Sequence, residues 1–182
     1  MTESLNIPDH LAALAELDSL LRRHDVPYWL FGGWAVDFHA GRVTRDHADI
    51  DIAIYSDDRA PLAALLRDHG WVHRPEVSED GYTCYERQQI RLEVAFLARD
   101  ERGHVYTPLK DGRGEWPTDS FGDEVAQLRG VHVRLVSRAS LIADKSIVRS
   151  DTVTAAKDRA DLVALSYPVG RSAPPPDATA RD

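Results

Sequence analysis

Residues 28–55 read YWLFGGWAVDFHAGRVTRDHADIDIAIY, and no other part of the chain says as much about its structure. Near the end of this stretch, Asp49 and Asp51 alternate with three isoleucines. Such alternation is typical of a strand with one buried face, because successive side chains point to opposite sides. We therefore predict a strand whose isoleucines face a core and whose aspartates share the other face, about 6.7 Å apart.

Two carboxylates on one face of a strand favour a metal site. Like charges so close repel each other, and one of them resists ionisation unless a cation removes that repulsion. Hard oxygen ligands suit Mg²⁺, and two metal ions about 3.5–4 Å apart are a common device for displacement at phosphorus. We therefore predict Asp49 and Asp51 as ligands of Mg²⁺, with two ions at the site.

A glycine pair precedes the acidic strand. The apolar run Val26–Phe31 ends at Gly32 and Gly33, and residues 34–39 have the pattern of the first turns of a helix. A strand, a glycine turn and a helix present backbone N–H groups to an anion, and glycine lets that anion approach closely. Alone, the dipeptide indicates only a turn. Placed just before the acidic pair, it predicts a triphosphate-binding turn.

The loop between this helix and the acidic strand contains Arg42, Arg45 and His47. Charges in a loop are usually just solvated, but arginine is well suited to phosphate, because its planar fork donates two parallel hydrogen bonds. Beside a phosphate and metal site we predict Arg42 and Arg45 as triphosphate ligands. For His47 two roles stay equally open, a hydrogen bond to the nucleotide or a structural role in the loop.

A third carboxylate lies in the strand-like run of residues 91–97, where Glu93 is the one acid in a mostly apolar segment. An unpaired buried charge is costly. One interpretation is a surface glutamate on an edge strand, or one paired with Arg91 or Arg87. The sharper interpretation places Glu93 beside the two aspartates, where it completes the metal site or accepts the proton of an attacking hydroxyl.

These motifs resemble the lincosamide nucleotidyltransferases and the aminoglycoside-2''-adenylyltransferases, within the polymerase-beta-like nucleotidyltransferase superfamily. The resemblance is dense over residues 28–55 and continues more loosely to Glu93 and the C-terminal helices. Members of that family use Mg²⁺ to transfer a nucleoside monophosphate from ATP, or another NTP, to a hydroxyl of a drug. The resemblance implies Asp49 and Asp51 as metal ligands, Glu93 as third carboxylate and general base, and the glycine pair as phosphate-binding turn.

Two short helices are predicted near the end of the chain, one over residues 137–148 that Ser137 caps and one over residues 151–167. Family members carry a lysine on the first of them, here Lys145, which the resemblance implies as a ligand of a nucleotide phosphate. They also carry a Lys-Asp-Arg-x-Asp run on the second, here from Lys157 to Asp161. For that run, an ordinary surface ion pair across one helical turn is an equally good interpretation.

The resemblance and the periodicity together predict an α+β nucleotidyltransferase fold. We expect a mixed, twisted sheet with helices mainly on one face, the carboxylates in the opposite groove, and short C-terminal helices. We expect one domain over residues 1–167 and a disordered polar, proline-rich tail over 168–182. Further predicted elements are a helix over 8–24, a helix capped by Ser56 or Asp57 and ending near Asp68, strands over 71–73 and 82–87, and a hairpin turning at Arg129 and Gly130.

Composition narrows the function classes. The chain has 182 residues, 43% of them hydrophobic and 29% charged, as in a globular domain. Its net charge of −8 disfavours a nucleic-acid substrate and suits a small cationic acceptor. A single cysteine, Cys84, fits a reducing cytoplasm. No apolar run is long enough to cross a membrane, and from the first residues we expect no secretory signal.

We therefore expect a cytoplasmic, Mg²⁺-dependent antibiotic-resistance transferase that moves AMP from ATP to a hydroxyl of an aminoglycoside or a lincosamide. By resemblance to the smallest lincosamide enzymes, a homodimer would supply the wall that the short C-terminal helices leave out. One alternative is a nucleotidyltransferase that modifies a protein or tRNA in a toxin–antitoxin system. Another is a non-catalytic nucleotide-binding module, which three clustered acids disfavour because such a module does not need them.

Overall fold

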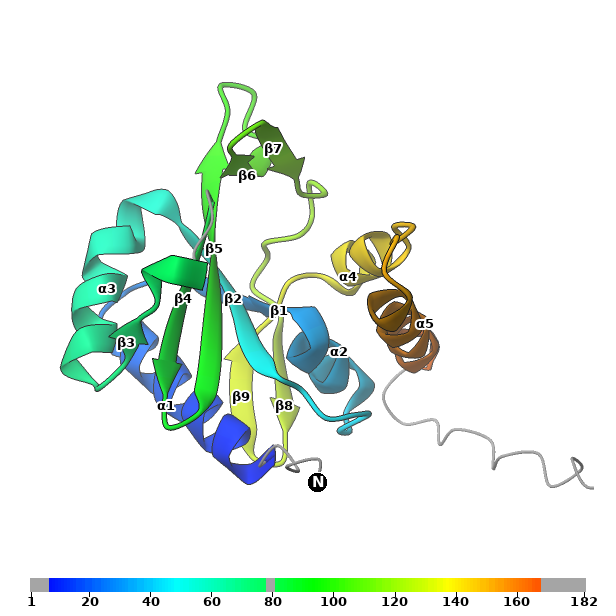
Figure 1. Cartoon of the computed structure of the whole chain (residues 1–182), viewed down its shortest axis with the longest axis horizontal. Helices are drawn as coiled ribbons and strands as arrows, with labels where there is room; N and C mark the ends of the chain where they lie inside the picture. Colours follow the sequence, from blue (N-terminus) through cyan, green and yellow to red (C-terminus); the bar gives the residue numbers. More distant parts are fainter. Residues whose placement is uncertain (1–6, 78–80, 168–182) are drawn as a thin grey trace, which may run out of the picture.

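A mixed β-sheet forms the centre of the fold in the computed structural model, which describes residues 7–77 and 81–167 (Figure 1). Its spatial order is β1 (Tyr28–Phe31), β2 (Asp49–Tyr55), β5 (Ile90–Arg99), β4 (Tyr82–Arg87) and β3 (Val72–His73). The strands β2 and β5 are parallel, and the other neighbours are antiparallel. The predicted mixed sheet is therefore confirmed.

One hairpin extends this sheet to seven strands, and another forms a small separate sheet. The strands β6 (Val105–Leu109) and β7 (Gly112–Glu115) continue from the end of β5 and project away from the helices (Figure 1). A separate hairpin consists of β8 (Val125–Leu128) and β9 (Val131–Arg134). It turns at Arg129 and Gly130, whose φ angles of 49° and 85° are those of a tight hairpin turn, as the sequence predicts.

The helices lie in two groups. They are α1 (Ile7–Arg23), α2 (Gly32–Ala40), α3 (Arg59–Asp68), α4 (Arg138–Lys145) and α5 (Thr152–Ser166), with short 3-10 turns η1 (Ser56–Asp58) and η2 (Pro75–Val77). In Figure 1, α1 runs behind the strands with α3 beside it, and α4 and α5 pack together on the far side of α2. A side-chain hydrogen bond joins α1 to α2: the Trp34 indole of α2 donates to Nδ1 of His10 of α1 at 3.2 Å.

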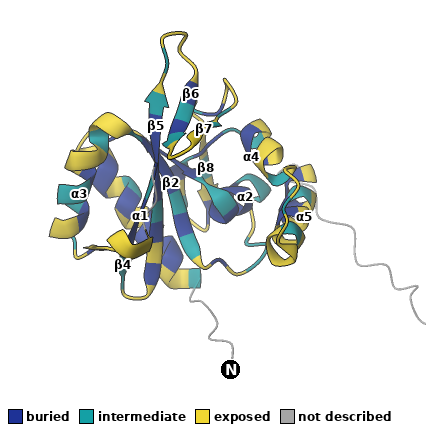
Figure 2. Cartoon of the chain, turned by 45° about the horizontal axis from the view of Figure 1, so that its top comes forward, coloured by how far each residue is buried: buried dark blue, intermediate teal, exposed yellow. Residues whose placement is uncertain are grey.

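The core lies between the inner face of the sheet and these helices. Figure 2 shows the buried positions concentrated along the central strands and α2. The three isoleucines of β2 are fully buried, as predicted from their alternation with the aspartates. Burial of one such side chain contributes about 1.5–3 kcal/mol to stability. The fully or almost fully buried residues that surround them include Leu14, Leu17, Leu21, Leu92 and Val94.

The cap predicted at Ser137 of α4 is confirmed, whereas the cap predicted for α3 is wrong. Ser137 accepts from the Ser140 amide at 3.1 Å, and Asp151 accepts from two amides of α5. By contrast, α3 begins only at Arg59, after η1, and has no side-chain cap, so the prediction of Ser56 or Asp57 was wrong. The Ser56 hydroxyl instead donates to the Leu97 carbonyl at 3.0 Å, a tertiary partner that local sequence does not reveal.

Smaller differences concern the ends of elements. The helix after the glycine pair begins at Gly32 itself, two residues earlier than predicted, and α4 ends at Lys145 rather than near Val148. The predicted tail, residues 168–182, lies outside the described residues, and the single domain over 1–167 stays a prediction. Within residues 7–77 and 81–167, no helix combines the length and the apolar character needed to cross a membrane.

Candidate active site

Three carboxylates converge on the outer face of the sheet. In the parallel pair of β2 and β5, Asp51 lies directly beside Glu93. Asp49 is two residues before Asp51 on β2, so its side chain lies on the same face of the sheet. Each of the three side chains offers one oxygen, and these oxygens all lie within 4.8 Å of one another. The structure therefore brings together all three acids that the sequence singles out.

The chemistry of this oxygen set fits a hard divalent cation. Carboxylate oxygens are the ligands that Mg²⁺ prefers, and three anions in one place need positive charge between them. Arg91 supplies part of that charge, since its guanidinium lies 2.9 Å from Glu93. The two interpretations of Glu93, an arginine partner and a place in the acid cluster, are therefore both realised.

The surroundings of Asp51 disfavour its charged form. Burial, and then the negative charges of Asp49 and Glu93, hold the pKa of Asp51 well above its usual range. The positive charges of Lys145 and Arg45 act in the opposite direction and offset part of this effect. A bound divalent cation would remove the repulsion and favour the ionised carboxylate.

The raised pKa predicts how stability depends on pH. Protonated Asp51 is favoured in the folded state, so its stabilising contribution is present at low pH and is lost as pH rises through the folded-state pKa. In EDTA at neutral pH, we expect the Asp51→Asn variant to melt at a higher temperature than the wild type. Mg²⁺ should then raise the melting temperature of the wild type only. Indistinguishable melting curves for the two proteins across pH, in EDTA, would contradict this.

The glycine pair lies against the residues with which it was predicted to act. Gly32 has a φ of 67°, and a Cβ atom there would overlap Oδ2 of Asp51. A Cβ atom at Gly33 would overlap Nδ1 of His47 and the guanidinium of Arg45. The first turn of α2 has no acidic residue and no side-chain cap, which leaves the N–H groups at the start of this helix suited to an anion.

His47 is held inside the loop. Arg45 donates to Nδ1 of His47 at 3.0 Å, and because arginine only donates, the ring carries its proton on Nε2 and donates it to Asp37 at 2.6 Å. The imidazole also packs against Trp34, with ring centroids 4.6 Å apart. Both ring nitrogens are thus engaged, which favours the structural role for His47 over a hydrogen bond to nucleotide.

Asp37 is a central residue that the sequence analysis did not single out. It is completely buried and accepts from the Thr44 amide at 3.0 Å and from the Thr44 hydroxyl, besides His47. It therefore ties α2 to the loop that leads into the acidic strand. Its one visible signal is an acid in an otherwise apolar helix, where a charge needs partners.

Arg45 and Lys145, two cations predicted to bind phosphate, share a carboxylate on α5. Nε and Nη2 of Arg45 donate to the two oxygens of Asp161 at 3.0 and 3.1 Å. Nζ of Lys145 lies 3.3 Å from Asp161 and 3.1 Å from Asp158. Asp161 thus pairs with two distant cations, and Lys157 is exposed, so the surface pair of these two residues is not formed. Within the described part of the chain, the exposed Arg42 side chain makes no hydrogen bond or ion pair.

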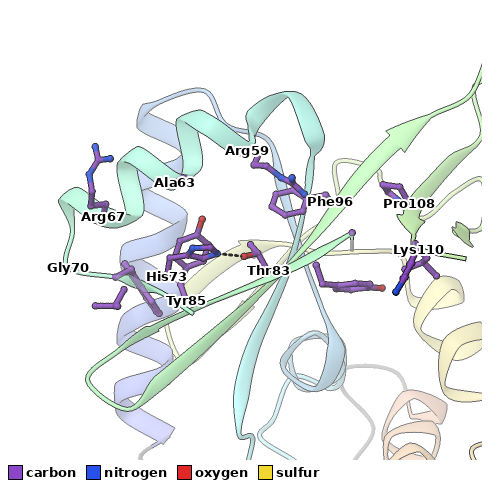
Figure 3. A pocket seen from close by; sticks show the side chains of 15 residues that line it. Arg59, Ala63, Arg67, Gly70, His73, Thr83, Tyr85, Phe96, Pro108 and Lys110 are labelled. Carbon is purple, nitrogen blue, oxygen red and sulfur yellow. Dashed lines mark hydrogen bonds between the residues drawn. The ribbon is translucent and has the colours of Figure 1, made fainter. Parts of the chain in front are cut away.

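A cavity of about 1140 Å³ lies on the opposite side of the sheet, among α3, β3, β4 and β6 (Figure 3). Its lining includes Thr83, Tyr85 and Phe96, with the Arg59 guanidinium 3.8 Å above the Phe96 ring. Side chains alternate along a strand, so Phe96 faces away from the side that bears Glu93. Tyr82 also lines the cavity but lies on the side that bears Glu93, because Cys84, two residues further along β4, is the register partner of Glu93.

A mixed sheet, a glycine turn that opens a helix, and three acids on neighbouring parallel strands define a protein of the nucleotidyltransferase-fold class. The family model for aminoglycoside-2''-adenylyltransferases matches residues 13–164. The chain belongs to that family, which confirms the resemblance seen in its motifs.

Individual relatives agree with this family. A 2''-aminoglycoside nucleotidyltransferase of Escherichia coli is 45% identical over 42 residues, which are 23% of this chain and 24% of that protein. A lincosamide resistance protein of Staphylococcus haemolyticus is 34% identical over 80 residues, 40% of this chain and 50% of that protein. The matches therefore span a quarter to a half of the length of these relatives.

Solved structures confirm the fold. The lincomycin-bound lincosamide adenylyltransferase LnuA has a TM-score of 0.66 and 20% identity, and the match covers 85% of this chain and 95% of that one. ANT(2'')-Ia in complex with adenylyl-2''-tobramycin also has a TM-score of 0.66, with 21% identity and coverage of 86% and 90%.

Proposed function

We propose that this protein transfers AMP from ATP to a hydroxyl group of a small cationic molecule, an aminoglycoside or a lincosamide. The observation that carries the proposal is the convergence of Asp49, Asp51 and Glu93 beside the glycine turn of α2. Family membership and the antibiotic-modifying names of the relatives support the choice of acceptor.

The nucleotide part of the site follows from the anion-binding groups. The Gly32 and Gly33 turn offers backbone N–H groups to the triphosphate. Arg45 and Lys145 supply positive charge beside the acids, as their effect on Asp51 indicates. Arg42 is exposed and has no partner among residues 7–77 and 81–167, so its side chain is available to a phosphate.

The transfer itself needs an activated hydroxyl and a stabilised leaving group. The acceptor oxygen attacks the α-phosphorus in line with the departing pyrophosphate. Glu93 accepts the proton of that hydroxyl. Two Mg²⁺ ions, held by Asp49, Asp51 and Glu93, would neutralise the charge that develops on the phosphates.

Aromatic side chains border the acid cluster on one side. Phe31 is the register partner of Asp51 on β1, so the two side chains lie on the same face. Trp116 packs edge-on against Phe31 at 5.6 Å and against Phe121 at 5.0 Å, and its indole donates to Thr107. Trp116 is thus held in place by two aromatic rings and one hydrogen bond. The Phe31 and Trp116 pair is the apolar wall that we assign to the acceptor side.

The proposal includes a homodimer and a cytoplasmic location. α4 and α5 pack mainly on each other and on α2. Asp49, Asp51 and Glu93 are only partly buried, so one side of the acid cluster is open. A second copy of the chain is the occupant that we assign to that side. A single buried cysteine and a net charge of −8 support a cytoplasmic enzyme with a cationic acceptor.

A direct assay tests this function. The protein is incubated with ATP or GTP, Mg²⁺ and a panel of aminoglycosides and lincosamides, and the products are identified by mass. We expect one drug class to gain the mass of a nucleoside monophosphate, and EDTA to prevent this. Adducts on protein or tRNA in a cell lysate, with none on the drugs, would show that the acceptor is a macromolecule and contradict the proposal. Nucleotide binding without any adduct would leave a binding module.

A further inference from the structure

We propose that Asp161 is a positioning residue for nucleotidyl transfer, which holds Arg45 and Lys145 together at the rim of the acid cluster. This inference rests on the proposed function. It assigns a role to a buried carboxylate on α5 whose hydrogen bonds and ion pairs go to Arg45 and Lys145. In this role Asp161 acts through the two cations.

The Asp161 carboxylate is buried, so its charge needs cationic partners. Its side chain is 1% exposed, and a buried carboxylate without cationic partners would be strongly destabilising. Arg45 fills both of its oxygens with the parallel hydrogen bonds of a bidentate pair, and Lys145 adds a third contact. The guanidinium plane of Arg45 is thereby fixed in orientation.

The pairing joins segments that are remote in sequence. Arg45 belongs to the loop that leads into β2, Lys145 is the last residue of α4, and Asp161 lies on α5. The ion pair of Arg45 and Asp161 spans 116 positions of the chain. Figure 1 shows α4 and α5 set apart from the sheet. The ion pair of Arg45 and Asp161 therefore connects the C-terminal helices to the loop before β2.

The held arginine lies next to the reaction centre. A Cβ atom at Gly33 would meet the Arg45 guanidinium, and a Cβ atom at the adjacent Gly32 would meet Oδ2 of Asp51. Arg45 is further constrained by His47, and His47 by the buried Asp37. A continuous set of contacts thus runs from α5 to the glycine turn, where a Cβ at Gly33 would meet Arg45 and His47.

Asp158 provides a natural comparison. It is also buried, at 4% exposed, and it also contacts Lys145, but its second partner is Arg149 at 2.9 Å rather than Arg45. Arg149 also pairs with Asp144 of α4, so this group fastens α4 to α5. Both aspartates therefore hold α5 against α4 through Lys145, but of the two only Asp161 also pairs with Arg45 in the loop before β2.

The test measures nucleotide affinity and turnover in Asp161→Asn, Asp158→Asn and Lys157→Ala. Affinity is measured with a non-hydrolysable ATP analogue and Mg²⁺, without acceptor. We expect Asp161→Asn to bind the analogue roughly 10-fold more weakly and to lose 10- to 100-fold in kcat/KM for ATP, because misplaced groups lose their alignment with the phosphates. The KM for the acceptor should stay unchanged. Lys157→Ala, an exposed change on the same helix, should behave as the wild type.

A double-mutant cycle tests whether Asp161 acts through Arg45. In an Arg45→Gln background, we expect Asp161→Asn to cause little further loss, since residues of one network are not additive. Arg45→Lys keeps the charge and removes the fork, so it should reproduce the loss even if Asp161→Asn folds poorly.

Several results would overturn the proposal. They are additive losses in the cycle, equal losses in Asp158→Asn and Asp161→Asn, or tighter nucleotide binding by Asp161→Asn, which would mean that its charge merely opposes the phosphates. Transfer by the wild type with an unaffected Asp161→Asn removes the inference and leaves the proposed function. Nucleotide binding without transfer removes the proposed function, and the affinity measurement still decides the inference. A wild type that binds no nucleotide removes both.

Discussion

The Asp51→Asn variant should lose nucleotidyl transfer almost completely, with kcat lower by about 10³-fold or more. Asp51 is the middle member of the acid cluster, next to Asp49 along its strand and beside Glu93 across the parallel pair. An amide of the same size keeps the packing but removes one anionic ligand, and metal ions contribute several kcal/mol of charge stabilisation to such reactions. A 10³-fold loss corresponds to about 4 kcal/mol at the transition state.

The measurement is product formation from ATP and the drug identified in the assay above, with Mg²⁺ in excess. Asp57→Asn is the matched control, because Asp57 is an exposed acid just after the same strand. We expect the control to retain wild-type activity. A substantial residual rate in Asp51→Asn would show that the acid cluster is not the reaction centre.

The Gly32→Ala variant is the second large effect that we expect, with activity reduced by about 100-fold and a lower melting temperature. Gly32 has a φ of 67°, where an L-residue is strained by roughly 1–2 kcal/mol. In addition, the new methyl group would overlap Oδ2 of Asp51, so the carboxylate or the turn must move. Displacement of a reacting group by about 1 Å is enough for a 100-fold loss.

Gly103→Ala separates these two causes. Gly103 has a similar φ of 84°, but a Cβ atom there has nothing within 4 Å. The control therefore introduces the same backbone strain without the overlap, and it should lose some stability and no activity. Both variants are compared by thermal melting and by turnover. Equal activity in the two would mean that the close approach of Gly32 to Asp51 has no role in catalysis.

Much of the local structure was predictable from periodicity and capping residues. The alternation around Asp49 and Asp51, the cap at Ser137 and the hairpin turn at Gly130 depend on neighbours a few positions away, and each is confirmed. The cap predicted for α3 failed for the opposite reason. The hydroxyl of Ser56 had a better partner on β5, far along the chain.

The sequence indicated the acids of the candidate site, but it did not indicate which residues hold its cations in place. The acids can be recognised in the sequence because a charged side chain in an apolar strand is costly unless it has a partner outside that strand. The arginine and lysine lie in polar segments, where charge is ordinary. For that reason the sequence suggested phosphate contacts for Arg45 and a surface pair for Asp161, and it contained no sign that these two residues bind each other.

The amino-acid sequence alone determined which segments become strands and helices and which face of each strand carries the acids. These properties follow from side-chain periodicity and from capping residues, which act within one or two turns of the chain. Only the tertiary structure decided that β2 and β5 are parallel neighbours, which sets Glu93 beside Asp51, and that α5 returns to the loop of Arg45. Such partners are chosen by how distant segments pack, and no local pattern specifies that packing.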